Sequence, residues 1–159
     1  MKIAILTVLL AFIVAFAAGV SLPVTCEMEL AAIEAEIAEL TAQNNGMPPV
    51  GYMKPDCLVD GTYAPRQCLG SVCKCVTAEG SKLTEDFSIG FAYKSDCACA
   101  RRKHEYSLKK MYGKFFDCNP IGSYNPIQCT GSVCYCVDYQ GNQVGPETAN
   151  IGSQDRLNC

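Results

Sequence analysis

The chain has no tryptophan and a single histidine, His104, which stands in a run of lysines and arginines. Nucleophilic and acid–base catalysis need an activated side chain beside a base, and this lone histidine provides no such pair. Beyond residue 19 no apolar run reaches the roughly 20 residues that a membrane-spanning helix needs. There is also no Asn-x-Ser/Thr sequence, so no N-linked glycan is expected. These absences predict a protein that is not an enzyme and that does not span a membrane after residue 19.

The residue that the chain has in abundance is cysteine, with twelve in 159 residues. Such a density is typical of small secreted domains, in which disulfides take the place of a large core. The N-terminus agrees, because Lys2 precedes the apolar run Ile3–Val14 and small residues follow at Ala17 and Gly19. This pattern predicts a signal peptide over residues 1–19 and an extracellular location.

Secretion through an oxidising compartment also limits which cofactors and partners are expected. Cys73 and Cys75 are separated by one residue, a spacing at which two thiolates can bind zinc. In an oxidising compartment these sulfurs become disulfides, so neither a metal nor another cofactor is expected. A nucleic-acid partner is not expected for a secreted protein with a formal net charge of −3.

A long internal repeat organises the chain. The segment Pro55–Val76 returns sixty-one positions later as Phe116–Val137, and in both copies the four cysteines follow at steps of eleven, five and two. Each copy is too short to bury much apolar surface, so its stability has to come largely from disulfides. The sequence therefore predicts two small modules.

The residues shared by the two copies resemble the thyroglobulin type-1 domain. They are Gly61-x-Tyr63, Gln67-Cys68, Cys73-x-Cys75-Val76 and Gly80, and then Gly122, Tyr124, Gln128-Cys129, Cys134-x-Cys136-Val137 and Gly141. One departure is that Lys74 and Tyr135 stand where the family usually has tryptophan. The resemblance implies a small disulfide-rich α+β fold with modules at 26–97 and 99–159. Each module would have a short N-terminal helix, a small antiparallel sheet and loops.

The disulfide pairing does not follow from the sequence alone, because six cysteines allow 15 connectivities. The resemblance implies that within each repeat the first cysteine pairs with the second, the third with the fourth and the fifth with the sixth. The implied pairs are Cys26–Cys57, Cys68–Cys73, Cys75–Cys97, Cys99–Cys118, Cys129–Cys134 and Cys136–Cys159. Only Ala98 then separates the repeats, so we expect them to be held in a restricted orientation.

The segment Cys26–Gln43 has the clearest helical pattern. Its apolar residues recur at steps of three, four and three, on one face, and five glutamates lie largely on the remaining surface. The apolar residues are Leu30, Ile33, Ile37 and Leu40. A helix of this length is marginal alone, so we expect its apolar face to dock, either on the disulfide core or on a partner. Repeat 1 carries eleven acidic and five basic residues, whereas repeat 2 carries five and seven.

The resemblance also implies a function, because chains built largely of these domains are similar to the thyropins, which inhibit papain-like cysteine proteases. In that mechanism a wedge of three loops enters the active-site cleft reversibly. In repeat 1 the leading loop would be Gly46–Met53, supported by Leu69–Val72 and Ala78–Lys82. The residues expected at the wedge are Gly46, Met47, Pro48, Pro49, Val50, Gly51, Leu69, Gly70, Ser71 and Gly80. The matching loops of repeat 2 are Leu108–Phe115, Thr130–Val133 and Tyr139–Gln143.

A second class of function stays open at this point. Domains of this family also serve as non-inhibitory binding or spacer modules, and small cross-linked secreted proteins are found in venom and saliva. The sequence has one basic patch, in the first loop of repeat 2, that could bind a sulfated polysaccharide or another acidic surface. A solvated helix face is the competing interpretation. The patch consists of Arg101, Arg102, Lys103, Lys109, Lys110 and Lys114.

Overall fold

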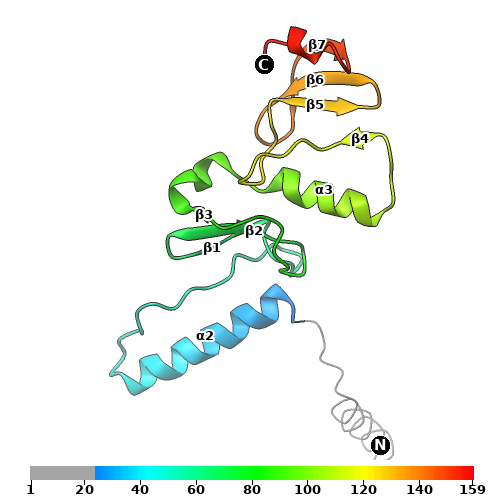
Figure 1. Cartoon of the computed structure of the whole chain (residues 1–159). Helices are drawn as coiled ribbons and strands as arrows, with labels where there is room; N and C mark the ends of the chain where they lie inside the picture. Colours follow the sequence, from blue (N-terminus) through cyan, green and yellow to red (C-terminus); the bar gives the residue numbers. More distant parts are fainter. Residues whose placement is uncertain (1–23) are drawn as a thin grey trace, which may run out of the picture.

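A helix followed by a small antiparallel sheet occurs twice along the chain, as Figure 1 shows for this computed structural model. The structure describes residues 24–159, and the predicted signal peptide lies outside the described residues. Repeat 1 contains α2 (Cys26–Gln43), β1 (Arg66–Leu69), β2 (Val72–Cys75), β3 (Phe87–Ser88) and the 3-10 helix η1 (Ile89–Lys94). Repeat 2 contains α3 (Ala98–Leu108), β4 (Lys114–Phe115), β5 (Ile127–Thr130), β6 (Val133–Val137), β7 (Gln143–Asn150) and η2 (Gln154–Arg156). The predicted fold class is confirmed.

Each sheet is organised around a tight hairpin that a disulfide closes. The strand orders are β1-β2-β3 and β4-β5-β6-β7, all antiparallel. Cys68 lies opposite Cys73 in the first hairpin and Cys129 lies opposite Cys134 in the second, with Cα atoms 4.0 Å apart in both pairs. This cross-strand bond fixes the register of the hairpin, and therefore the position of its turn.

All twelve cysteines are paired, and their sulfurs make up much of the buried core. The pairs are Cys26–Cys57, Cys68–Cys73, Cys75–Cys97, Cys99–Cys118, Cys129–Cys134 and Cys136–Cys159, the same six that the family resemblance implies. Around them each repeat buries one tyrosine and one valine, Tyr63 with Val76 and Tyr124 with Val137. A core this small leaves many apolar side chains at the surface.

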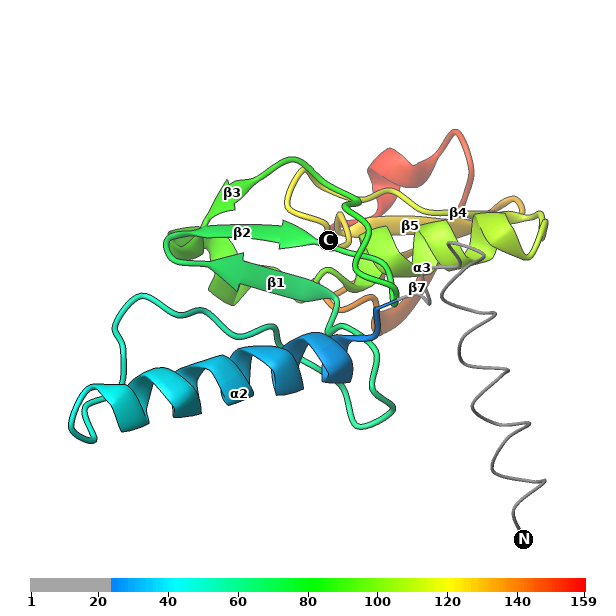
Figure 2. The ribbon, with the colours of Figure 1, turned by 90° about the horizontal axis from the view of Figure 1, so that it is seen from below.

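Helix α2 is joined to the disulfide core of repeat 1 at its first turn. Thr25 caps it by accepting a hydrogen bond from the Met28 backbone N–H, at 3.3 Å, and Cys26 is fully buried. The four residues of the predicted apolar face are only half-buried. In Figure 2 the chain that follows the helix runs back beside it, between the helix and the sheet. The far end of α2 therefore extends past the sheet and carries the loop that begins at Asn44.

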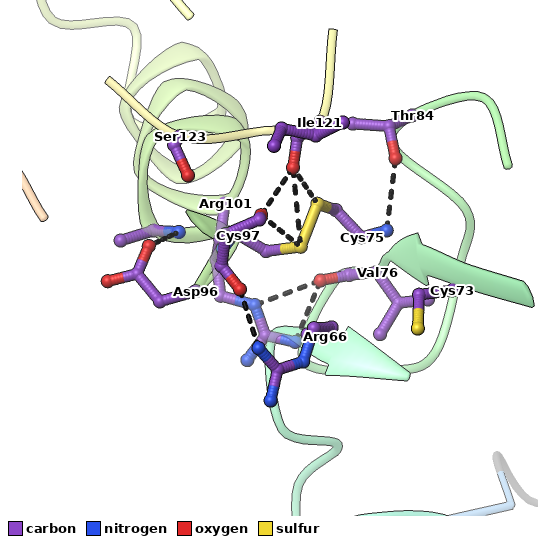
Figure 3. Close-up of a disulfide and its surroundings, with 12 residues drawn as sticks. Arg66, Cys73, Cys75, Val76, Thr84, Asp96, Cys97, Arg101, Ile121 and Ser123 are labelled. Carbon is purple, nitrogen blue, oxygen red and sulfur yellow. Dashed lines mark hydrogen bonds between the residues drawn. A yellow bond between two sulfur atoms is a disulfide. The ribbon is translucent and has the colours of Figure 1, made fainter. Parts of the chain in front are cut away.

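The two repeats meet at the Cys75–Cys97 disulfide, shown in Figure 3. Arg101 extends from α3 of repeat 2 into repeat 1, where its guanidinium donates to the Val76 carbonyl, at 3.0 and 2.8 Å, and to the Thr77 carbonyl, at 2.7 Å. Ser123 Oγ donates to the Lys94 carbonyl at 2.9 Å. These contacts join the repeats across Ala98, which agrees with the expected restricted orientation.

Gly122 allows this junction to close. Its φ is +84°, and a Cβ at this position would overlap Cys75 Sγ. Gly152 has a similar φ, +91°, but a Cβ there would meet nothing within 4 Å. Substitution of each glycine by alanine therefore separates the free-energy cost of a left-handed backbone, present at both positions, from the cost of close packing, present only at Gly122.

We predict that Gly122→Ala lowers the free energy of unfolding by about 2–4 kcal/mol, from backbone strain plus overpacking. Gly152→Ala should cost only about 1 kcal/mol, from strain alone. Thermal unfolding of the two oxidised variants beside the parent chain measures both. Equal losses in the two variants would contradict the close packing of the repeats.

Candidate functional site

The leading loop, Gly46–Met53, extends beyond the sheet at the C-terminal end of α2 (Figure 1). The Asn44 carbonyl accepts a hydrogen bond from the Met47 N–H at 3.0 Å, which closes the turn after the helix. Pro48 and Pro49 fix φ in the segment that follows. The side chain of Val50 is 96% exposed, so it forms the apex of the loop.

The chain that returns from this apex is tied to α2 and to the β1–β2 turn. The Tyr52 hydroxyl donates to Glu36 at 2.5 Å, and this hydrogen bond is the main reason that the pKa of Tyr52 is raised. Lys54 pairs with Glu34 at 2.9 Å. Further on, the Gly70 N–H donates to the sulfur of Met53 at 2.7 Å, so the leading loop contacts the hairpin turn.

The hairpin turn, Leu69–Val72, is the second exposed segment. Leu69 is 70% exposed, and Gly70 has φ +62°, which the tight turn requires. The structure therefore places the predicted loops Gly46–Met53 and Leu69–Val72 together, at one edge of repeat 1.

A third segment, Ser88–Lys94, completes this edge. The Ile89 N–H donates to the Ser71 carbonyl at 2.8 Å, and Ser88 lies opposite Val72 in the sheet. Ile89 and Phe91 are exposed beside the hairpin turn. We define the repeat 1 edge as six exposed apolar residues of the three segments, which are Met47, Val50, Leu69, Val72, Ile89 and Phe91.

The predicted loop Ala78–Lys82 does not belong to this edge. It follows the opposite end of β2, where the Tyr63 N–H donates to the Ala78 carbonyl at 3.0 Å. Gly80 packs against the ring of Tyr63, and a Cβ there would come within 2.9 Å of Cε2. In this structure Gly80 therefore supports the core. Ile89 and Phe91 lie beside the hairpin turn, where the sequence predicts Gly80. A sequence signal was present, because Ile89-Gly90 recurs as Ile151-Gly152.

Repeat 2 has an edge of the same construction. The Ile151 N–H donates to the Ser132 carbonyl at 2.8 Å, as Ile89 does to Ser71, and β4 pairs with β5 beside the hairpin turn. The apex of its leading loop is Tyr112, which is 92% exposed. We call its exposed apolar residues the repeat 2 edge, which consists of Met111, Tyr112, Phe115, Val133 and Ile151.

The predicted basic patch is divided by the structure. Arg101 is buried in the junction between the repeats and is not part of the exposed patch. Arg102 lies over the ring of Tyr124, at 5.9 Å from its centre, and Lys114 lies over the ring of Phe116, at 5.1 Å. Lys103, Lys109 and Lys110 are exposed. Arg101 leaves the patch because it is the member of the run that faces the carbonyls of Val76 and Thr77, directly after β2.

Between the described residues 24 and 159, no group of three or more histidine, cysteine, aspartate or glutamate side chains is arranged to hold a metal ion. Within the same part of the chain, no helix is long and apolar enough to cross a membrane. A groove of about 490 Å³ runs along repeat 1, lined by Met53, Leu69 and Val72 as well as by Tyr63 and Gly80. Both apolar and polar side chains of repeat 1 line this groove.

Tyr63 connects α2 to this framework. Its hydroxyl donates to Glu29 in the first turn of the helix, and this hydrogen bond, with burial, raises the pKa of Tyr63 to about 12. An ordinary tyrosine has a pKa near 10. The neutral phenol is therefore favoured in the folded protein, and its contribution to stability is complete below about pH 10 and lost as the pH rises through about 12.

We predict that Tyr63 ionises about two pH units later than an ordinary tyrosine. Absorbance at 295 nm, recorded from pH 9 to 13, should show this late component in the parent chain and lack it in Tyr63→Phe. Glu29→Gln should move the component back towards pH 10. If Tyr63→Phe removed a component near pH 10 and Glu29→Gln changed nothing, the hydrogen bond to Glu29 would be absent.

Comparison with known proteins agrees with this architecture. Equistatin from Actinia equina is 29% identical over 115 residues, which cover 64% of this chain and 47% of equistatin. U20-hexatoxin-Hi1a from Hadronyche infensa is 30% identical over 111 residues, covering 66% of this chain and 71% of the hexatoxin. Thyroglobulin from Sus scrofa is 29% identical over 119 residues, covering 69% of this chain but only 4% of thyroglobulin.

The chain thus spans a small part of thyroglobulin and less than half of equistatin. The family model described as the thyroglobulin type-1 repeat matches twice, over residues 26–90 and 94–159. Together the two matches cover most of the chain. The protein therefore belongs to the thyroglobulin type-1 family, as a tandem of two repeats.

Proposed function

We propose that this protein is a secreted inhibitor of papain-like cysteine proteases, and that the repeat 1 edge enters the active-site cleft reversibly. The observation that supports the proposal is the bracing of three chain segments on one another along a single exposed apolar edge. Val50 is the most exposed apolar residue of the edge, and Leu69 and Ile89 are the exposed apolar residues of the two supporting segments. The sequence that matches this chain makes up 47% of equistatin, a relative of the protein.

The construction of the edge favours tight binding by limiting the entropy lost on association. The hairpin turn is closed by Cys68–Cys73, and η1 is held to it by the Ile89 N–H and the Ser71 carbonyl. Two prolines stiffen the segment before Val50. A binding loop that is already ordered loses less freedom than a flexible one, so more of its contact energy appears as affinity.

The same features would protect the inhibitor from being cut. A protease has to draw an extended backbone deep into its cleft, and here the hairpin turn is held in place by the Cys68–Cys73 bond and by the Ile89 N–H on the Ser71 carbonyl. In this mechanism the edge covers the catalytic cysteine and histidine of the protease and contributes apolar contacts, and no covalent step is needed.

We predict that Val50→Arg weakens inhibition of a susceptible papain-like protease by at least about tenfold, because about 1.5–3 kcal/mol of apolar contact is lost at the apex. Val59→Arg is the matched control, since Val59 is fully exposed in the same repeat but lies in the turn before Gly61, away from the edge. Inhibition constants for the two variants and the parent, with mass spectrometry of the recovered chain, give the test.

An intact chain that inhibits, with a loss confined to Val50→Arg, supports the proposal. Equal inhibition by all three chains would exclude this loop from the contact. If a correctly oxidised chain inhibited no papain-like protease, the non-inhibitory binding module would become the better description, with a sulfated polysaccharide on Lys103, Lys109 and Lys110 as its first candidate ligand.

A further inference from the structure

The two edges face opposite sides of the molecule. In Figure 1 the β1–β2 turn and the loop after α2 lie on one side, whereas the β5–β6 turn and the loop between α3 and β4 lie on the other. Figure 2, turned by 90°, shows the β1–β2 turn and the α3–β4 loop again on opposite sides. A partner bound at one edge therefore leaves the other edge open.

This separation is fixed by the junction between the repeats. Arg101 binds two carbonyls of repeat 1, Ser123 binds the Lys94 carbonyl, and Gly122 packs directly on the Cys75–Cys97 disulfide. Only one residue separates Cys97 from Cys99, and both are in disulfides. The repeats cannot rotate to bring their edges onto one partner without breaking these contacts.

The repeat 2 edge offers a distinct chemistry. Tyr112 takes the place of Val50 at the apex, and Phe115 and Val133 are exposed in β4 and β6. Lys109 and Lys110 precede Tyr112 in the chain and Lys114 follows it, so the leading loop of repeat 2 carries three cationic groups. Repeat 1 carries six more acidic than basic residues, whereas repeat 2 carries two more basic than acidic ones. The complementary surface is an apolar cleft with an acidic rim.

We propose that the chain is bivalent, with the repeat 2 edge binding a second papain-like protease molecule whose cleft has an acidic rim. This inference rests on the proposed function, because it assigns the same class of partner to the second edge. Each edge then acts independently, and one chain joins two protease molecules. Association at repeat 2 gains from electrostatic steering and weakens with added salt.

The test measures stoichiometry with the intact oxidised chain lacking residues 1–19. The probes are two papain-like proteases of opposite net charge, each with its catalytic cysteine replaced by serine so that nothing is cut. Light scattering on complexes formed in excess protease gives the number of protease molecules per chain. Calorimetry at low and at higher salt gives the two affinities.

With the acidic protease we expect two molecules per parent chain, and one for Val50→Arg or for Tyr112→Glu. The fold tolerates the second change, because the hydrogen bond at this position runs from the Tyr106 hydroxyl to the backbone carbonyl of Tyr112. Val144→Glu, at an exposed apolar position of β7 outside the edge, is the matched control and should still bind two.

The outcomes distinguish the two proposals. One molecule per parent chain, lost in Val50→Arg and kept in Tyr112→Glu, overturns the bivalent inference and leaves the proposed function in place. One molecule lost in Tyr112→Glu and kept in Val50→Arg overturns both the bivalent inference and the role of the repeat 1 edge, and leaves binding at repeat 2 alone. No binding of either protease overturns both.

Discussion

The arrangement of the whole molecule depends on one buried cation. Arg101 donates three hydrogen bonds to the carbonyls of Val76 and Thr77, at the point where the chain leaves β2. Burial lowers the pKa of its guanidinium, and the nearby carboxylates of Glu105, Glu79 and Asp60 oppose that shift. An arginine stays charged in proteins, so this side chain can be buried only where acceptors surround it. The two carbonyls supply them, and two small modules thereby become one body.

The size of the core explains why the rest of the surface looks as it does. Sulfur atoms, one tyrosine and one valine fill the centre of each repeat, and the rings of Tyr63 and Tyr124 pack on Gly80 and Gly141. Disulfides stabilise such a fold chiefly by restricting the unfolded chain, so the loops are not needed to bury apolar surface. Residues such as Val50 and Tyr112 can then remain exposed, and their exposure is what makes the two edges candidates for binding.

The sequence predicted those features that depend on local pattern or on the cysteine framework. The bounds of α2 and the existence of two modules follow from spacing, and the pairing agrees with what the family resemblance implies. It did not predict that Arg101 leaves the basic patch, because which residue of a charged run faces a neighbouring module is decided by tertiary packing. Nor did it predict the role of Ile89, because a backbone hydrogen bond to Ser71 creates that contact and the recurrence of Ile-Gly in both repeats was its only sequence signal.

The two repeats differ most in how their leading loops are held, and this difference separates what each edge can do. In repeat 2 the segment after the apex forms β4, which pairs with β5, so the backbone beside Tyr112 is part of a sheet. In repeat 1 the equivalent segment is held by side chains, through Met53 and through Tyr52 and Lys54 on the surface of α2. Exposed contacts of this kind contribute little to stability, so the order of the loop at Val50 depends on its two prolines and on its contact with the hairpin turn. The same cysteine framework thus presents one apolar edge that prolines stiffen and one edge with basic residues that a sheet supports.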